Sequence, residues 1–283
     1  MMWRDKSLFV LGLGLFCGVV LCIQMGLFLA NVFLGPSFYD NIFQICIRIF
    51  KQGTVEYYGV LFVVNSYVIF SIFVLCKKIV QQISNTIRLK KKIARLTNWE
   101  KTNELNQRYK RKRKKIVVIN SNELVALTFG LRNPCILLST TLIEMLESVE
   151  LEAVIQHETA HQKFHHPLKV FLLKTISEVM WYIPLTQWAY KNYKIMIELV
   201  ADEYAIKLMG TELGLGSALL KLVKTHLETK THSLLVPFAD GTIDYRLKHL
   251  IEPYYALPFK LQTKSIIISV NVMILLIILM MIV

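Results

Sequence analysis

Three long stretches without a charged side chain constrain the fold of this chain more than any other feature. They cover residues 7–35, 59–76 and 265–283. A helix needs about 20 consecutive apolar residues to cross the hydrocarbon core of a bilayer. Hydrophobic residues make up 54% of the 283-residue sequence, above the roughly 45–50% that is usual in soluble domains. We therefore expect a multi-pass bacterial membrane protein, with spans at about 7–34, 57–76 and 263–283.

The first stretch has a second interpretation as a secretory signal peptide, because a short basic segment, residues 1–6, precedes it. Its uncharged run of roughly 28 residues is much longer than the 7–15 residues of a signal-peptide core. We therefore expect a retained membrane anchor.

The net charge of +13 is concentrated in residues 77–115, where fifteen Lys and Arg residues face only two acids, Glu100 and Glu104. A basic segment directly after a span is typical of the cytosolic side and of contact with anionic lipid. Nucleic acid also attracts such a charge, but the position beside a span already accounts for it. We expect contact with the lipid bilayer, no specific nucleic-acid binding, and a catalytic region in the cytosol.

Local patterns divide the region after the second span. Residues 77–115 are predicted to form a basic helical connector, broken near Thr97 and Asn98. IVVIN (116–120) and CILLS (135–139) have the composition of short strands, and the segment ALTFGLRNP between them contains turn residues. We expect a small β-sheet here.

Helical periodicity begins at residue 140, where Thr140 or Thr141 is able to cap a helix. We expect this helix to continue until shortly before Pro167. Residues 168–190 are apolar but contain charges and a central proline, so we expect a hairpin at the membrane interface rather than a span.

A further helix is predicted from about Trp188 to Met209, ended by Gly210. The core domain therefore covers about residues 116–262, after an N-terminal membrane region (1–76) and the connector (77–115). A C-terminal membrane helix (263–283) follows.

The segment VIQHETAHQKFHH, residues 154–166, places His157 and His161 four residues apart. On a helix this spacing puts both rings on one face, where they are able to bind one zinc ion. Glu158 lies beside that face and is the candidate catalytic base that takes a proton from an activated water molecule. A solvated polar patch on an ordinary helix is the alternative.

A third ligand is the test between these interpretations. Glu198, in IELVADEYA on the second predicted helix, is the candidate, and Asp202 lies one turn further on the same face. Asp202 is expected to accept a hydrogen bond from the far nitrogen of a ligating histidine. A surface acid beside Lys194 is the other interpretation of Glu198.

A third histidine ligand is not expected. The extended pattern H-E-x-x-H-x-x-G-x-x-H would need Gly at Phe164 and His at Pro167. His166 is instead expected to be a supporting or surface residue.

The order ALTFGLRNPCILLS, ELEAVIQHETAH, WYIPLTQWAYK and ELVADEYAIKLMG, followed by DYRLKHL, resembles the BlaR/MecR family of membrane zinc metallopeptidases. The similarity covers roughly residues 116–210. It implies a gluzincin-like α+β peptidase domain, with one zinc ion on His157, His161 and Glu198 and with Glu158 as catalytic base.

The resemblance also implies that Ile136, Leu137 and Leu138 in CILLS form an edge strand along which an extended substrate pairs. The implied substrate is a winged-helix repressor of the BlaI/MecI type, whose cleavage lifts repression.

Several features depart from that family. Ala201 and His166 stand where Cys and Asp are common, and the N-terminal membrane region is shorter by a span. The sequence ends at Val283 without a penicillin-binding sensor domain, so direct β-lactam sensing is not expected.

Two functional alternatives and one assembly state stay open at this stage. The Ala-Asp pair is also similar to membrane proteases of the HtpX and CAAX-protease type, which act in quality control or peptide processing. A non-catalytic signalling or immunity protein is the second alternative. A homodimer is an open assembly state. We expect a mainly α membrane protein that carries a cytosolic zinc endopeptidase with a small β-sheet.

Overall fold

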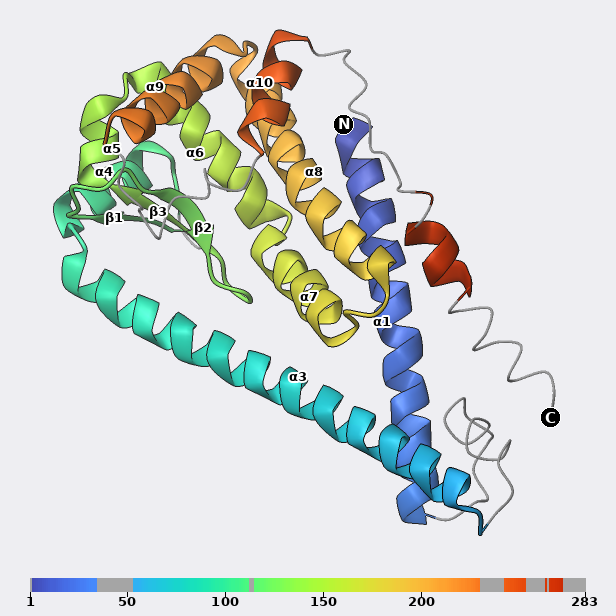
Figure 1. Ribbon diagram of the computed structural model, residues 1–283. Coiled ribbons are helices and arrows are strands. Elements are labelled where there is room, and N and C mark those ends of the chain that lie inside the picture. The colour runs from blue at the N-terminus through green and yellow to red at the C-terminus, as the bar shows by residue number, and fades with distance from the viewer. Residues whose placement is uncertain are drawn as a thin grey trace. The chain divides into compact units, whose positions relative to one another are not determined.

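A computed structural model of the chain is mainly helical, with one small sheet (Figure 1). It describes residues 2–34, 53–111, 115–229, 242–252, 263 and 265–271. Most of the predicted C-terminal span (263–283) lies outside these residues.

The chain divides into two compact units. The helical unit contains Val10–Ile83, Leu172–Lys191 and Phe259–Val283. The sheet unit contains Met1–Phe9, Ser84–Phe171 and Asn192–Pro258. This division differs from the one expected from the sequence, because most of the connector belongs to the sheet unit and most of the hairpin belongs to the helical unit.

Long apolar helices dominate the helical unit. α1 (Met2–Leu34) and α3 (Val55–Leu96) contain the two segments of the described chain that are long and apolar enough to cross a membrane, Trp3–Leu27 and Phe62–Leu96. Both agree with spans predicted from the sequence. The break predicted near Thr97 and Asn98 is confirmed, because α3 ends at Leu96 and α4 (Trp99–Arg108) follows.

The apolar segment predicted as a hairpin is a pair of helices. α7 (His166–Val179) and α8 (Pro184–Met209) are joined by a turn at residues 180–183. Within the helical unit, Gly14 and Gly18 of α1 let that helix approach α7 closely, since a Cβ at either position would collide with an α7 side chain. The Gly14–Gly18 spacing matches the small-residue pattern of packed membrane helices.

The sheet has the strand order β1-β3-β2. β1 (Ile116–Ile119) pairs in parallel with β3 (Cys135–Ser139), and β2 (Ala126–Phe129) pairs antiparallel with the other side of β3. The strands β1 and β3 were predicted. β2 was missed because its residues were assigned to the turn segment between the two predicted strands, which contains Gly130 at φ +102°.

This strand order corrects the expected substrate strand. Ile136, Leu137 and Leu138 are buried and lie in the central strand, where both sides are already paired. CILLS is therefore not an edge strand, and that prediction was wrong. The sheet edges are β1 and β2, and β2 is the one that packs against α6.

The single helix predicted from residue 140 is two helices, α5 (Thr140–Met145) and α6 (Ser148–Lys163). Ser139, rather than a threonine, caps α5, because its hydroxyl accepts a hydrogen bond from Leu142 N–H at 3.2 Å. A new helix starts where the carboxylate of Glu150 accepts a hydrogen bond from the Glu147 N–H at 2.8 Å.

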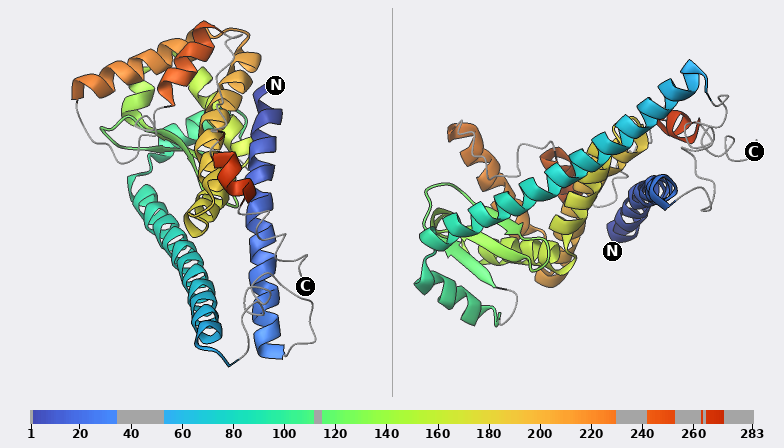
Figure 2. Two further views of the ribbon diagram at one scale, coloured as in Figure 1. Left: turned by 45° about the vertical axis from the view of Figure 1, so that its right-hand side comes forward. Right: turned by 90° about the horizontal axis from the view of Figure 1, so that it is seen from below.

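α6 runs through the middle of the sheet unit. It packs against β2, β3 and α9 (Leu213–Thr229), as Figure 1 and Figure 2 show from several sides. It ends before Pro167, as predicted, where His165 adopts φ +53°. α8 ends at Gly210, also as predicted, and α10 (Ile243–Ile251) follows a segment outside the described residues.

Candidate metal centre and active site

The two histidines of the motif lie on one face of α6. His157 and His161 are 5% and 9% exposed, and their Nε2 atoms are 3.1 Å apart. Burial of both rings with their Nε2 atoms converging is not the geometry of a solvated polar patch. The α6 periodicity alone produces this arrangement, because residues four apart lie one turn apart.

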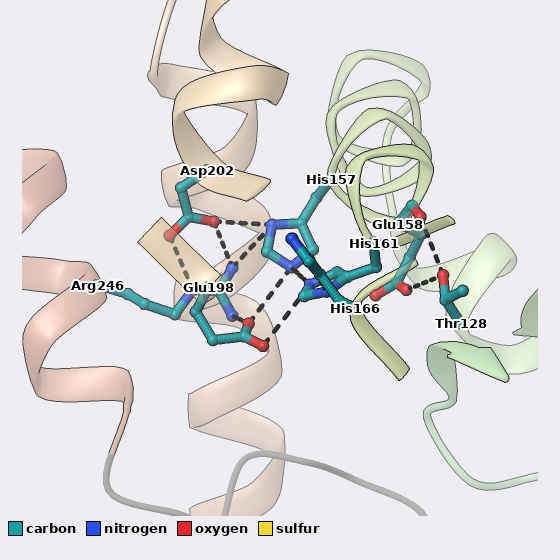
Figure 3. Close-up of polar contacts among 8 residues, drawn as sticks. All are labelled: Thr128, His157, Glu158, His161, His166, Glu198, Asp202 and Arg246. Carbon is teal, nitrogen blue, oxygen red and sulfur yellow. Dashed lines mark hydrogen bonds and ion pairs between the residues drawn. The ribbon is translucent and has the colours of Figure 1, made fainter. Parts of the chain in front are cut away.

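Glu198 of α8 completes the group (Figure 3). Its Oε2 lies 3.4 Å from His157 Nε2, and its Oε1 lies 3.6 Å from His161 Nε2. All three ligand atoms are within 4.8 Å of one another. The carboxylate predicted from the sequence is thus brought to the histidines by the packing of α8 beside α6.

The donor set suits zinc. A tetrahedral zinc ion holds nitrogen and oxygen ligands at about 2.0–2.1 Å, which places the ligand atoms about 3.3 Å from one another. The Nε2–Nε2 separation of 3.1 Å is close to that value, and each histidine Nε2 lies 3.4 or 3.6 Å from one of the two carboxylate oxygens of Glu198. Two imidazoles and one carboxylate also match the ligand types of catalytic zinc sites.

Asp202 fixes the orientation of His157. Its Oδ1 lies 2.8 Å from His157 Nδ1, and its side chain is fully buried. Burial and Arg246 favour the neutral ring, but the hydrogen bonds to Asp202 and Glu198 outweigh them and raise the pKa of His157 to about 9. Asp202 therefore lies where the sequence analysis expected it, on the far side of a candidate ligand.

Arg246 of α10 is a site residue that the sequence analysis did not single out. Its guanidinium donates to both oxygens of Asp202, at 2.9 and 2.7 Å, and lies 3.4 Å from Oε2 of Glu198. It lies in the DYRLKHL segment that carried part of the family resemblance, which was the available signal. Arg246 balances the charges of the buried Asp202 and the partly buried Glu198.

His166 supports the second histidine. Its Nδ1 lies 2.9 Å from Nδ1 of His161, so one ring donates to the other. Burial and the neighbouring His161 lower the pKa of His166 to about 2, which keeps it neutral. Burial likewise lowers the pKa of His161. A neutral His166 is able to accept the Nδ1 proton of His161 and leave Nε2 free to bind a metal.

Glu158 points away from the three ligands and towards β2 (Figure 3). Its Oε2 accepts a hydrogen bond from the hydroxyl of Thr128 at 2.8 Å. The carboxylate is buried beside the metal-binding group without joining it, the position that its place in the motif predicts for a catalytic base.

A pocket of about 280 Å³ opens over these residues. One part of its lining is polar and comes from the motif histidines, Glu158, Glu198 and Arg246. Another part is apolar and comes from four residues of α9: Leu215, Ala218, Leu219 and Leu222. Ala126, Leu127 and Thr128 of β2 also line the pocket, whereas Ile136, Leu137 and Leu138 do not.

The sequence matches a known peptidase family, described as BlaR1 peptidase M56, over residues 47–250. The chain belongs to this family. The matched range contains every residue of the site described above, and the resemblance expected from the sequence is confirmed. Membership in this peptidase family supports a membrane metallopeptidase.

One curated relative is the Regulatory protein BlaR1 of Bacillus licheniformis. It is 30% identical over 123 residues, which is 42% of this chain and 20% of that protein. The match therefore spans about a fifth of the relative.

Proposed function

We propose that this M56-family chain is a zinc endopeptidase that cleaves a protein substrate at the cytosolic face of the membrane. The observation that carries the proposal is the convergence of His157, His161 and Glu198 beside a buried Glu158, in a pocket that β2 also lines. The basic residues after the second predicted span support the cytosolic side.

Each side chain of the site has its own role in the proposed reaction. When bound, zinc supplies a Lewis acid that polarises the scissile carbonyl and lowers the pKa of an attacking water. Glu158 takes the proton of that water and passes it to the leaving amine. Asp202 and His166 hold the two imidazoles in the orientation that presents Nε2, and Arg246 balances the carboxylates of Asp202 and Glu198.

An extended substrate segment would bind along β2. The outer side of this strand has no strand partner among the described residues, and three of its residues line the pocket. Backbone pairing with a strand edge gives affinity without a strict sequence requirement. The apolar wall of α9 suits an apolar side chain next to the scissile bond.

A regulatory role is a more specific part of the proposal. A relative is named a regulatory protein, and we propose a repressor of the BlaI/MecI type as the substrate.

The test compares wild type with Glu158→Gln in cells, by mass spectrometry of newly formed peptide termini. Glu158→Gln should keep zinc and lose cleavage, and His161→Ala should lose both. Glu152→Gln, on the same helix but outside the pocket, is the matched control and should behave as wild type. Identical cleavage products in wild type and Glu158→Gln would support a non-catalytic protein instead.

A further inference from the structure

Thr128 makes two hydrogen-bond contacts with one residue. Its Oγ1 lies 2.8 Å from Oε2 of Glu158 and 2.9 Å from the main-chain oxygen of the same residue. A threonine hydroxyl carries a single proton, so the two acceptors share it. The contact ties the third residue of β2 to the side chain that the proposed reaction uses as its base.

Because Glu158 is buried, its contact with Thr128 is important. The residue is 6% exposed, and a buried carboxylate is costly unless it is hydrogen-bonded. Its other oxygen, Oε1, makes no hydrogen bond with any residue in the described part of the chain. Thr128 therefore engages one carboxylate oxygen and leaves the other available for proton transfer.

Competing positions for the carboxylate lie nearby. The Arg246 guanidinium and the metal-binding group are in the same pocket, and each attracts a carboxylate. A Glu158 side chain that turned towards either would no longer present a free oxygen to an attacking water. The hydrogen bond to Oε2 opposes that rotation, because a hydrogen bond to a charged group is among the stronger ones in proteins.

We propose that Thr128 is a positioning residue that holds Oε2 of Glu158, so that Oε1 carries the proton from the water to the leaving amine. The contact persists after proton uptake, because Oε2 of the protonated carboxyl is still an acceptor. Thr128 also belongs to the strand that is proposed to pair with substrate, so substrate docking and base orientation share one residue. This inference rests on the proposed function.

Two substitutions of Thr128 test the contributions of its hydroxyl group and its methyl group separately. Thr128→Val keeps the shape and removes the donor, and Thr128→Ser keeps the donor and removes the methyl group. The probe is a fluorescence-quenched peptide with apolar residues around the scissile bond, selected because wild type cleaves it and Glu158→Gln does not. Thr128→Val should lower kcat about 10- to 100-fold, the effect expected for loss of a hydrogen bond to a charged group, with KM and zinc content unchanged. Thr128→Ser should stay within about threefold of wild type.

An infrared measurement supplies a readout apart from activity. The carboxylate stretching band of Glu158 is identified by subtracting the spectrum of Glu158→Gln from that of wild type. The same band, measured in the Thr128→Val background, should shift, and in the Thr128→Ser background it should not. Zinc content is determined on the same samples.

Each outcome supports or overturns the inference. Equal kcat in Thr128→Val and wild type, an unshifted band, or a serine variant as slow as the valine variant would overturn it. A rise in KM alone would also overturn it and would limit Thr128 to substrate binding. Failure of the proposed function would give a different result. In that case wild type would cleave none of the peptides that Glu158→Gln leaves intact.

Discussion

Oδ1 of Asp202 lies 2.8 Å from Nδ1 of His157 and 2.7 Å from Nη2 of Arg246. One carboxylate oxygen therefore joins a candidate metal ligand on α6 to a buried cation on α10. Because Asp202 itself is on α8, the contact connects three helices at the point where the metal site forms.

Asp202→Asn should weaken zinc binding without abolishing it. The amide is able to keep the position but loses the charge that favours an Nδ1 proton on His157, and loss of such a partner costs about 10- to 100-fold in metal affinity. Competition with a fluorescent zinc chelator measures this. Asp244→Asn, at an exposed position in the first turn of α10, is the control, and equal affinities in the two variants would contradict the account.

Arg246→Met should destabilise the metal-free sheet unit. Removal of the guanidinium leaves the buried Asp202 and the partly buried Glu198 without their cation. Breaking a buried ion pair such as Arg246–Asp202 costs about 3–5 kcal/mol of unfolding free energy. Thermal unfolding in detergent with a chelator present should show a lower Tm. Lys248→Met on the exposed side of α10 should change Tm little, and similar Tm values for both variants would argue against the proposed role of Arg246.

Glu150 should make stability depend on acid pH. Burial raises its pKa, but hydrogen bonds from Lys221 at 2.7 Å and from Ser217 outweigh burial and hold the pKa below its ordinary value. A depressed folded-state pKa stabilises the protein above the unfolded-state pKa, and this contribution is lost as pH falls through the folded-state value. The Tm difference between wild type and Glu150→Gln should thus be largest near neutral pH and shrink below about pH 4.5. A difference that is constant across this range would contradict the prediction.

Gly14→Val should disrupt the helical unit. A Cβ at Gly14 would lie 2.5 Å from Cδ2 of Leu173 and 3.3 Å from Cβ of Ala189, so either the Leu173 side chain or α1 would have to shift. Gly12→Val is a matched control, because a Cβ there has nothing within 4 Å. Folded yield and Tm in detergent should fall for Gly14→Val alone and recover in part when Leu173 is replaced by Ala. Equal losses in Gly12→Val and Gly14→Val would rule out this packing.

The sequence predicted the parts of the site that depend on local spacing. His157, His161 and Glu158 are set by one helix, and Glu198 and Asp202 by another, so periodicity alone placed each group on a common face. Thr128 and Arg246 lie 30 and 44 residues from their partners in the chain. No periodic pattern relates positions that far apart, and only the folded chain brings them to the site.

The same distinction between local and long-range signals applies to the fold. The end of α6 at Lys163, before Pro167, and the end of α8 at Met209, before Gly210, have local causes and were predicted. The strand order was not, because whether β3 is central depends on the pairing of β2, a strand of four residues whose partner is chosen by packing against α6.

The central claim is that His157, His161 and Glu198 jointly hold one zinc ion. X-ray absorption spectroscopy of the purified wild-type protein, with metal analysis of matched variants, tests it most directly. The account predicts one zinc per chain with nitrogen and oxygen ligands at about 2.0–2.1 Å, retained in Glu158→Gln and lost in His161→Ala and Glu198→Ala. Sulfur ligands in the wild-type spectrum, or full zinc content in Glu198→Ala, would contradict it.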